Sequence, residues 1–195
     1  MLIWPPRKLV GEYSRHGYPA KDYQRLFDHL VDSGFRPEWL DGYSVGGSPY
    51  LNFTWRPASA PWRSYFLLSP ADDQARFNEA DQDGYRPVQV ESSLVKGQPR
   101  YSATFVKGLP GAAMARHGLT TAQHDALIQE AKGKGLSPVN VSVVSIGGER
   151  RYTVLYRSEG IGQWEMKSQV PESGYQALYD ANAAAGRRPV YLNAY

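Results

Sequence analysis

One spacing constrains the fold of this chain more than any other feature: a Gly-x-x-Pro motif recurs four times. Its glycines, Gly34, Gly84, Gly135 and Gly186, stand 50, 51 and 51 residues apart in a chain of 195. A fixed period of this length is typical of proteins built from stacked structural units. We therefore expect one repeat domain, residues 1–195. Its units span roughly 12–56, 62–106, 113–157 and 164–195, the last completed by residues 1–4.

A helical pattern precedes each of these glycines. The first unit shows the apolar i, i+3, i+4, i+7 stripe of a helix: Tyr23, Leu26, Phe27 and Leu30. Start signals agree in the next two units, where Ser69 precedes Pro70 and Thr120 forms a capping box with Gln123. The repeated glycine suits a left-handed C-cap, and the proline beyond it prevents continuation. We predict a helix of about eleven to fourteen residues in each unit.

Downstream of each proline the pattern favours a β-hairpin. First strands are predicted at Glu38–Ser44, Val88–Leu94, Val139–Ser145 and Val190–Tyr195. Second strands are predicted at Tyr50–Arg56, Arg100–Val106 and Arg151–Arg157. The turns between them contain Gly46-Gly47, Lys96-Gly97 and Gly147-Gly148. Two β-rich runs joined by a short glycine-bearing turn are typical of a hairpin.

The fourth hairpin lacks its second strand, and the other end of the chain supplies a candidate. Trp4 occupies the position held by Trp55, Phe105 and Tyr156, so Met1–Trp4 is predicted to pair with Val190–Tyr195. Such pairing would remove exposed sheet edges. We therefore predict an α+β fold in which four helix-plus-hairpin units close into a pseudo-fourfold ring, propeller- or barrel-like, with hairpins inside and helices outside. The alternative is an open, curved array whose end strands pair between molecules.

The unit resembles the bacterial tandem repeat family that also forms the N-terminal domain of the fungal polyglycine hydrolases. The resemblance rests on an aromatic residue followed by His-Gly, a helix, Gly-aromatic-Arg-Pro, a strand ending in Tyr and a strand ending in Trp. The first unit carries it most completely: Arg15-His16-Gly17, Gly34-Phe35-Arg36-Pro37, Gly42-Tyr43 and Trp55. In those hydrolases catalysis resides in a separate domain resembling a serine β-lactamase, for which this chain has no room. The resemblance thus implies a non-catalytic module.

Because of that association, two short matches to a serine-hydrolase signature need a structural interpretation. Ser93-Leu94-Val95-Lys96 matches S-x-x-K, and Tyr191-Leu192-Asn193 matches Y-x-N. The repeat places Ser93 at a strand end and Lys96 in a hairpin turn, whereas a nucleophile of this class opens a helix with its lysine one turn later. No Lys-Thr-Gly follows. We therefore predict no catalytic residues in this chain.

The other polar motifs indicate structure rather than chemistry. His16 and His117 are equivalent and too far apart in a ring to share a metal, so each is interpreted as a structural histidine that is hydrogen-bonded to backbone at a helix entrance. Acidic pairs such as Asp72-Asp73 are predicted to lie on a solvated helix face. No glycine-rich segment has the spacing of a phosphate loop. No metal or cofactor is expected.

Aromatic residues offer the one candidate binding surface. The repeat-equivalent Trp4, Trp55, Phe105 and Tyr156 are interpreted as core. A second set of equivalent strand positions combines aromatic with amide side chains: Trp39, Gln89, Asn140 and Tyr191. Because aromatic faces bury sugars and peptide segments well, these four are the predicted ligand contacts.

Net charge and composition disfavour some classes of partner, but they do not indicate the cellular compartment of the protein. Formal net charge is +3, with 22 basic and 19 acidic residues interspersed, which disfavours a nucleic-acid role. Cysteine is absent, and no apolar run is long enough to insert into a membrane. No signal peptide is visible, although a secreted protein in mature form would look the same.

Three functional hypotheses remain open from the sequence. The first is a binding or scaffold module that holds a glycan, peptide or protein. The second is a purely structural or engineered closed repeat without a ligand, and the third an unrecognised hydrolase. A monomer is expected if the ring closes within one chain, and a strand-exchanged oligomer if it does not.

Overall fold

The computed structural model describes residues 11–158 and 160–193 of the chain. Each of the first three units contains three strands and one helix. The first has β1 (Tyr13–Pro19), α1 (Ala20–Asp32), β2 (Phe35–Val45) and β3 (Ser48–Pro57). The second has β4 (Trp62–Leu68), α2 (Pro70–Gln82), β5 (Tyr85–Val95) and β6 (Gln98–Lys107). The third has β7 (Ala113–Leu119), α3 (Thr121–Gly133), β8 (Ser137–Ile146) and β9 (Glu149–Arg157), and the fourth has α4 (Glu172–Ala184).

The helices and their caps follow the sequence prediction. Each helix has 13 residues. Ser69 caps α2 by accepting from the backbone N–H of Asp72, and Thr120 closes a capping box with Gln123 at the start of α3. All four repeated glycines, of which Gly34 is the first, adopt positive φ just after the helix.

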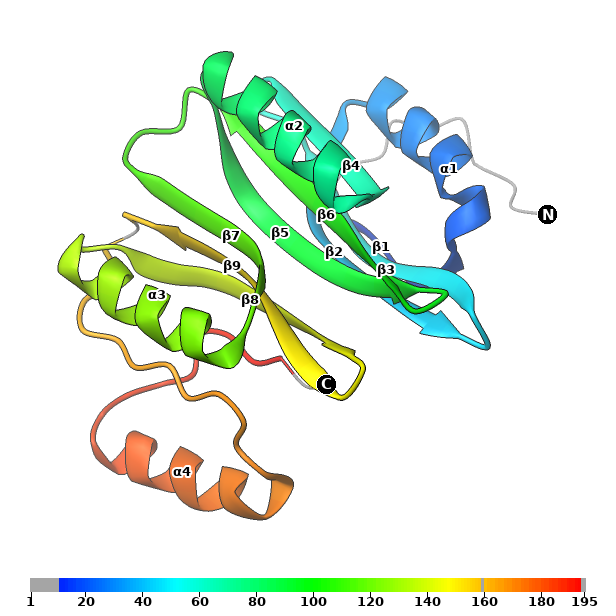
Figure 1. Cartoon of the computed structure of the whole chain (residues 1–195). Helices are drawn as coiled ribbons and strands as arrows, with labels where there is room; N and C mark the ends of the chain where they lie inside the picture. The colour runs from blue at the N-terminus through cyan, green and yellow to red at the C-terminus, as the bar shows by residue number, and fades with distance from the viewer. Residues whose placement is uncertain (1–10, 159, 194–195) are drawn as a thin grey trace.

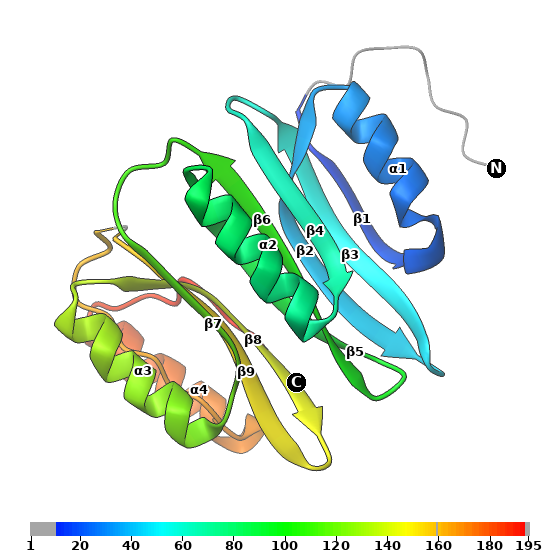
Figure 2. The same ribbon diagram turned by 45° about the horizontal axis from the view of Figure 1, so that its top comes forward.

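The predicted hairpins are confirmed in the first three units, but each sheet has a strand that was not predicted. The strand orders are β1-β3-β2, β4-β6-β5 and β7-β9-β8, so the strand that precedes the helix pairs with the second strand of the hairpin. One helix lies across a face of each sheet (Figures 1 and 2). The edge strands β2, β5 and β8 face one another, and this side-by-side arrangement joins successive units.

A bulge interrupts the additional strand where the His-Gly motif stands. The register of β1 with β3 shifts between Arg15 and Tyr18, and Gly17 at this point has a φ of 63°. Its N–H donates to the Asn52 side-chain oxygen at 2.9 Å, which satisfies a donor that the ladder leaves unpaired. The motif therefore places a bulge in the strand shortly before the helix begins.

The fourth unit differs from the other three within the described residues. Residues 190–193 carry no strand, and no residue of α4 is buried. The described strands form three separate sheets and no closed barrel. The predicted strand Met1–Trp4 lies outside the described residues, so ring closure is not confirmed.

The hairpin turns offer a test of backbone strain. Lys96 and Gly97 both have positive φ, 51° and 73°, as a type I′ turn requires, and a side chain other than Gly, Asn or Asp is strained there. We expect Lys96→Asn to stabilise the protein by about 0.5–1 kcal/mol in urea unfolding. Lys96→Gln, which removes the charge but keeps the strain, should give no gain; an equal gain would assign the effect to charge.

Candidate ligand-binding site

The four positions predicted as ligand contacts lie along the line where successive units meet. Gln89 and Asn140 are buried, whereas Trp39 is 40% exposed and Tyr191 37% exposed. Three of the four bond to a backbone carbonyl of the preceding unit: Gln89 to Leu40 at 2.6 Å, Asn140 to Val90, and Tyr191 to Val141 at 3.0 Å. These side chains hold one unit against the next. Their contact with a ligand stays a prediction.

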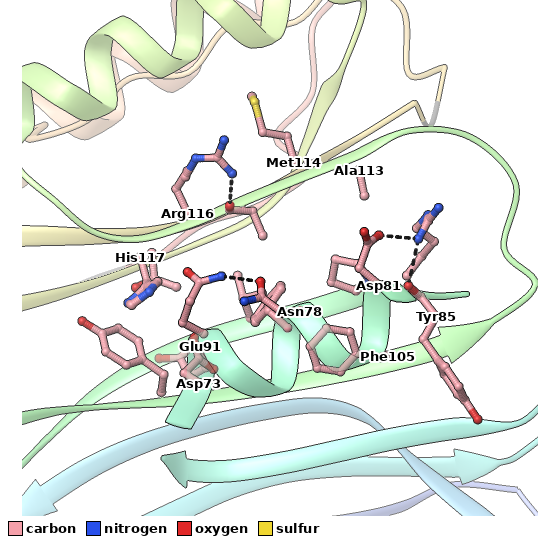
Figure 3. A pocket seen from close by; sticks show the side chains of 18 of the residues that line it. Asp73, Asn78, Asp81, Tyr85, Glu91, Phe105, Ala113, Met114, Arg116 and His117 are labelled. Carbon is pink, nitrogen blue, oxygen red and sulfur yellow. Dashed lines mark hydrogen bonds and ion pairs between the residues drawn. The ribbon is translucent and has the colours of Figure 1, made fainter. Parts of the chain in front are cut away.

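A pocket of about 950 Å³ lies elsewhere, between the second and third units. Its walls come from α2, β5 and β6 on one side and from β7 on the other. Figure 3 shows Asp73, Glu91 and His117 at one end of this pocket, with Asp81 and Tyr85 toward the other. The corresponding groove between the first and second units holds a smaller recess of about 550 Å³, lined in part by Phe27 and Trp62.

The larger pocket exists because an aromatic side chain is missing from one repeat position. Trp62 packs against the first unit, with its ring 5.8 Å from that of Phe27 and 5.9 Å from that of Trp55. Trp164 occupies the same position after the third unit and packs 6.0 Å from the Tyr156 ring. Between the second and third units the position is held by Ala113. The groove is not filled there, and the pocket reaches the core of the second unit.

Two further positions around the pocket change from aromatic to polar. In the first groove Tyr23 and Phe66 pack edge to face, with ring centroids 4.8 Å apart. Their equivalents in the second groove are Asp73 on α2 and His117 on β7. The substitutions coincide at one interface, so they replace an apolar seam with a polar cavity.

Asp73 is the most unusual of these residues. Only 3% of it is exposed, and its carboxylate makes no hydrogen bond or ion pair with any described residue. Burial raises its pKa from 3.8 to about 7. At neutral pH the group is therefore divided between its charged and neutral forms, which is characteristic of a functional position.

Tyr101 and His117 form the wall beside Asp73. Their rings meet edge to face with centroids 4.4 Å apart. Burial raises the pKa of Tyr101, and the charge of Asp73 raises it further, which places the two groups within electrostatic reach. Burial lowers the pKa of His117, so its ring is mainly neutral at pH 7.

Glu91 supplies a second buried carboxyl group to the pocket lining. It is 5% exposed and accepts a hydrogen bond of 2.6 Å from the Ser142 hydroxyl. Burial raises its pKa well above the usual value, and the nearby charge of Asp41 acts in the same direction. Burial therefore disfavours the ionised form of Glu91, which is hydrogen-bonded in the seam between units.

Two interpretations of the sequence are corrected here. Asp73 was expected on a solvated helix face, but α2 turns it toward the sheet. Its equivalence to Tyr23, a member of the apolar stripe, was the signal that would have identified it. His117 does stand at a helix entrance, but neither it nor His16 is hydrogen-bonded to backbone in the described structure.

The hydrolase-like pair is placed as the sequence predicted. Ser93 lies buried on β5, and Lys96 lies in the turn after that strand. Within the described ranges, no three His, Asp or Glu side chains cluster to hold a metal. In the same ranges, no helix has the length and apolar character needed to cross a bilayer.

Comparison with known families agrees with the resemblance seen in the sequence. A family model described as "Polyglycine hydrolase-like, structural repeat" matches four consecutive segments, residues 10–58, 59–108, 110–158 and 161–195. The pocket lies between the second and third of these segments. No curated protein matches the chain.

Proposed function

The chain belongs to the polyglycine hydrolase-like structural repeat family, and we propose that it acts as a non-catalytic binding module with its ligand in the pocket between the second and third units. One observation carries this proposal: the apolar seam seen at the first interface is replaced at the second by Asp73, Ala113 and His117 around a cavity of about 950 Å³. That volume falls in the range of small-molecule sites.

The chemical character of the walls supports a ligand of mixed polarity. Phe77 and Phe105 pack edge to face with centroids 4.7 Å apart and form an aromatic floor. Asp73 and His117 provide polar groups at one end. Such a combination suits a sugar, a peptide side chain or an aromatic small molecule, in which an apolar body carries a polar group.

The test compares two sites on one chain. Wild type would be screened by ligand-observed NMR against monosaccharides, dipeptides and small aromatic compounds, alongside Ala113→Trp and Trp39→Ala. Tryptophan at position 113 reproduces the packing of Trp62, so it should fill the pocket in a folded protein.

We expect at least one compound to bind wild type and Trp39→Ala, and to bind Ala113→Trp at least tenfold more weakly. Loss of binding only in Trp39→Ala would move the site to the predicted set at the unit edges. No binding by any compound would favour a structural repeat without a ligand and would overturn the proposal.

We also propose that the fourth unit is completed by residues 1–4 and that the four units form a ring. On α4 the equivalents of buried core positions are exposed, Tyr175 by 39% and Tyr179 by 43%. In the repeat alignment Leu2 and Trp4 match Phe53 and Trp55, which cover α1 in the first unit. The same segment would therefore cover the apolar face of α4.

The electrostatic surroundings of Tyr191 support convergence of the units around one axis. Burial is the main cause that raises the pKa of its phenol, and the nearby acidic groups Glu91 and Asp41, in the second and first units, raise it further. Trp39 is equivalent to Gln89, and Leu192 is equivalent to Leu40. In a closed ring the Trp39 indole N–H would therefore donate to the Leu192 carbonyl, as the Gln89 amide donates to the Leu40 carbonyl.

Deleting residues 1–4 is expected to cost about 2–4 kcal/mol of unfolding free energy, because it would uncover a core face. Urea unfolding and light scattering on a sizing column measure stability and mass together. A monomer of unchanged stability would contradict closure. A wild-type dimer that dissociates on deletion would show that the segment pairs between chains instead.

A further inference from the structure

The pocket contains a carboxylate that nothing in the described structure neutralises. Buried charges in proteins are normally paired, because removing a carboxylate from water without a partner is costly. The positions equivalent to Asp73 are the aromatic Tyr23, His124 and Tyr175. An acid at this core-facing position is therefore not explained by packing.

The basic side chains that line the pocket are engaged elsewhere. Arg86 forms an ion pair of 2.7 Å with Asp81. Arg116 turns its guanidinium back onto the Ala115 carbonyl at 2.8 Å, and Lys134 pairs with Glu130. These contacts leave Asp73 without a counter-ion among the residues that the structure describes.

The surrounding walls suit a positive charge. Tyr101 and His117 stand beside Asp73, and Phe77 and Phe105 line the same cavity. Aromatic faces attract cations, most strongly in sites shielded from water. Met114 adds a polarisable apolar surface.

We propose that the pocket binds an organic cation, an ammonium group on an apolar or aromatic body, with the Asp73 carboxylate as its ion partner and Tyr101 and His117 as its walls. This inference rests on the proposed function, since it assigns the ligand class of the same pocket. The cation would act as the counter-ion of Asp73, and the apolar body of the ligand would pack on the aromatic floor formed by Phe77 and Phe105.

Binding should depend on pH through Asp73. Of the elements packed on α2, β5 contributes Tyr85, Arg86 and Glu91 to the lining, β6 contributes Tyr101, and no residue of β4 lines the pocket. From the third unit, β7 adds Arg116 and His117, and Lys134 follows α3. Burial disfavours the charged forms of Glu91, Tyr101 and His117. Since the pKa of Asp73 is about 7, its ionised fraction falls about tenfold between pH 8 and pH 6.

Benzylamine is the probe, with benzyl alcohol as its uncharged counterpart of the same shape. Isothermal titration of wild type, Asp73→Asn and Ala113→Trp would be run at pH 8 and pH 6. Asparagine imitates the neutral acid, so Asp73→Asn should remain folded. At pH 8 we expect wild type to bind benzylamine at least tenfold more tightly than benzyl alcohol, with about a fivefold to tenfold loss at pH 6.

Asp73→Asn should bind benzylamine at least tenfold more weakly and lose the pH dependence, and Ala113→Trp should bind neither compound. Equal binding of amine and alcohol, or unchanged amine binding by Asp73→Asn, would overturn the cation assignment while the pocket stands. The cation assignment would also be overturned, and the pocket would stand, if benzylamine failed to bind while another compound of the screen bound wild type but not Ala113→Trp. Failure of every compound would overturn the proposed function as well.

Discussion

Replacing Trp55 by alanine should destabilise the protein by about 3–5 kcal/mol, the largest loss expected from a single substitution. Its side chain is fully buried and lies 5.2 Å from the Phe27 ring on α1, measured between centroids. It also contacts Trp62 of the next unit at 5.9 Å. The loss therefore combines a cavity inside one unit with a weakened contact to its neighbour.

Urea unfolding followed by far-UV circular dichroism measures this effect without relying on the deleted fluorophore. Val45→Ala is the control, because Val45 is 58% exposed at the end of a hairpin strand and should change stability by less than about 0.5 kcal/mol. Similar small losses in both variants would contradict the shared aromatic core.

Asp73→Asn should act in the opposite direction and stabilise the protein at pH 8 by about 2–4 kcal/mol. The pKa of Asp73 is about 7 in the folded protein and near 3.8 when exposed. Between these values the folded state binds more protons, so wild-type stability falls as pH rises through this window. Above pH 7 the full cost of the buried charge is present, and asparagine avoids it.

The pH series supplies the decisive comparison. At pH 4.5 the wild-type carboxyl is protonated in the folded protein, so the gain from Asp73→Asn should shrink to below about 1 kcal/mol. Asp72→Asn is the matched control. Asp72 is the neighbouring acid on the same helix, but its carboxylate is exposed and accepts a hydrogen bond from the Ser69 hydroxyl. A variant at position 73 that destabilises at every pH would reveal a structural partner for the carboxylate.

The repeat made much of the fold predictable from sequence. Helices, caps and hairpins depend on local signals, such as the capping box at Thr120 and the paired glycines at Gly46-Gly47, and these recur in register. The strand before each helix was not predicted, because the bulge at His16-Gly17 breaks the alternation of inward and outward side chains that indicates a strand. The sequence analysis instead interpreted His16 and His117 as residues at a helix entrance.

The candidate site was harder to predict, because it forms between units. Asp73 comes from one unit and His117 from the next, and no local pattern indicates that they line one cavity. The information was present in the exchange of Trp62 for Ala113 and of Tyr23 for Asp73 between units. Residues that replace a core aromatic in one unit therefore indicate this site better than the match of Ser93 and Lys96 to an enzyme signature.

An amide-resolved NMR titration with benzylamine at pH 8 tests the central claim, that the broken seam between the second and third units is a ligand site. The predicted result is a set of saturable shift changes confined to residues 73–78, 101–105 and 113–117. Saturable changes centred on Trp39 and Tyr191 would contradict it, as would the absence of any saturable change with benzylamine and with every compound of the screen.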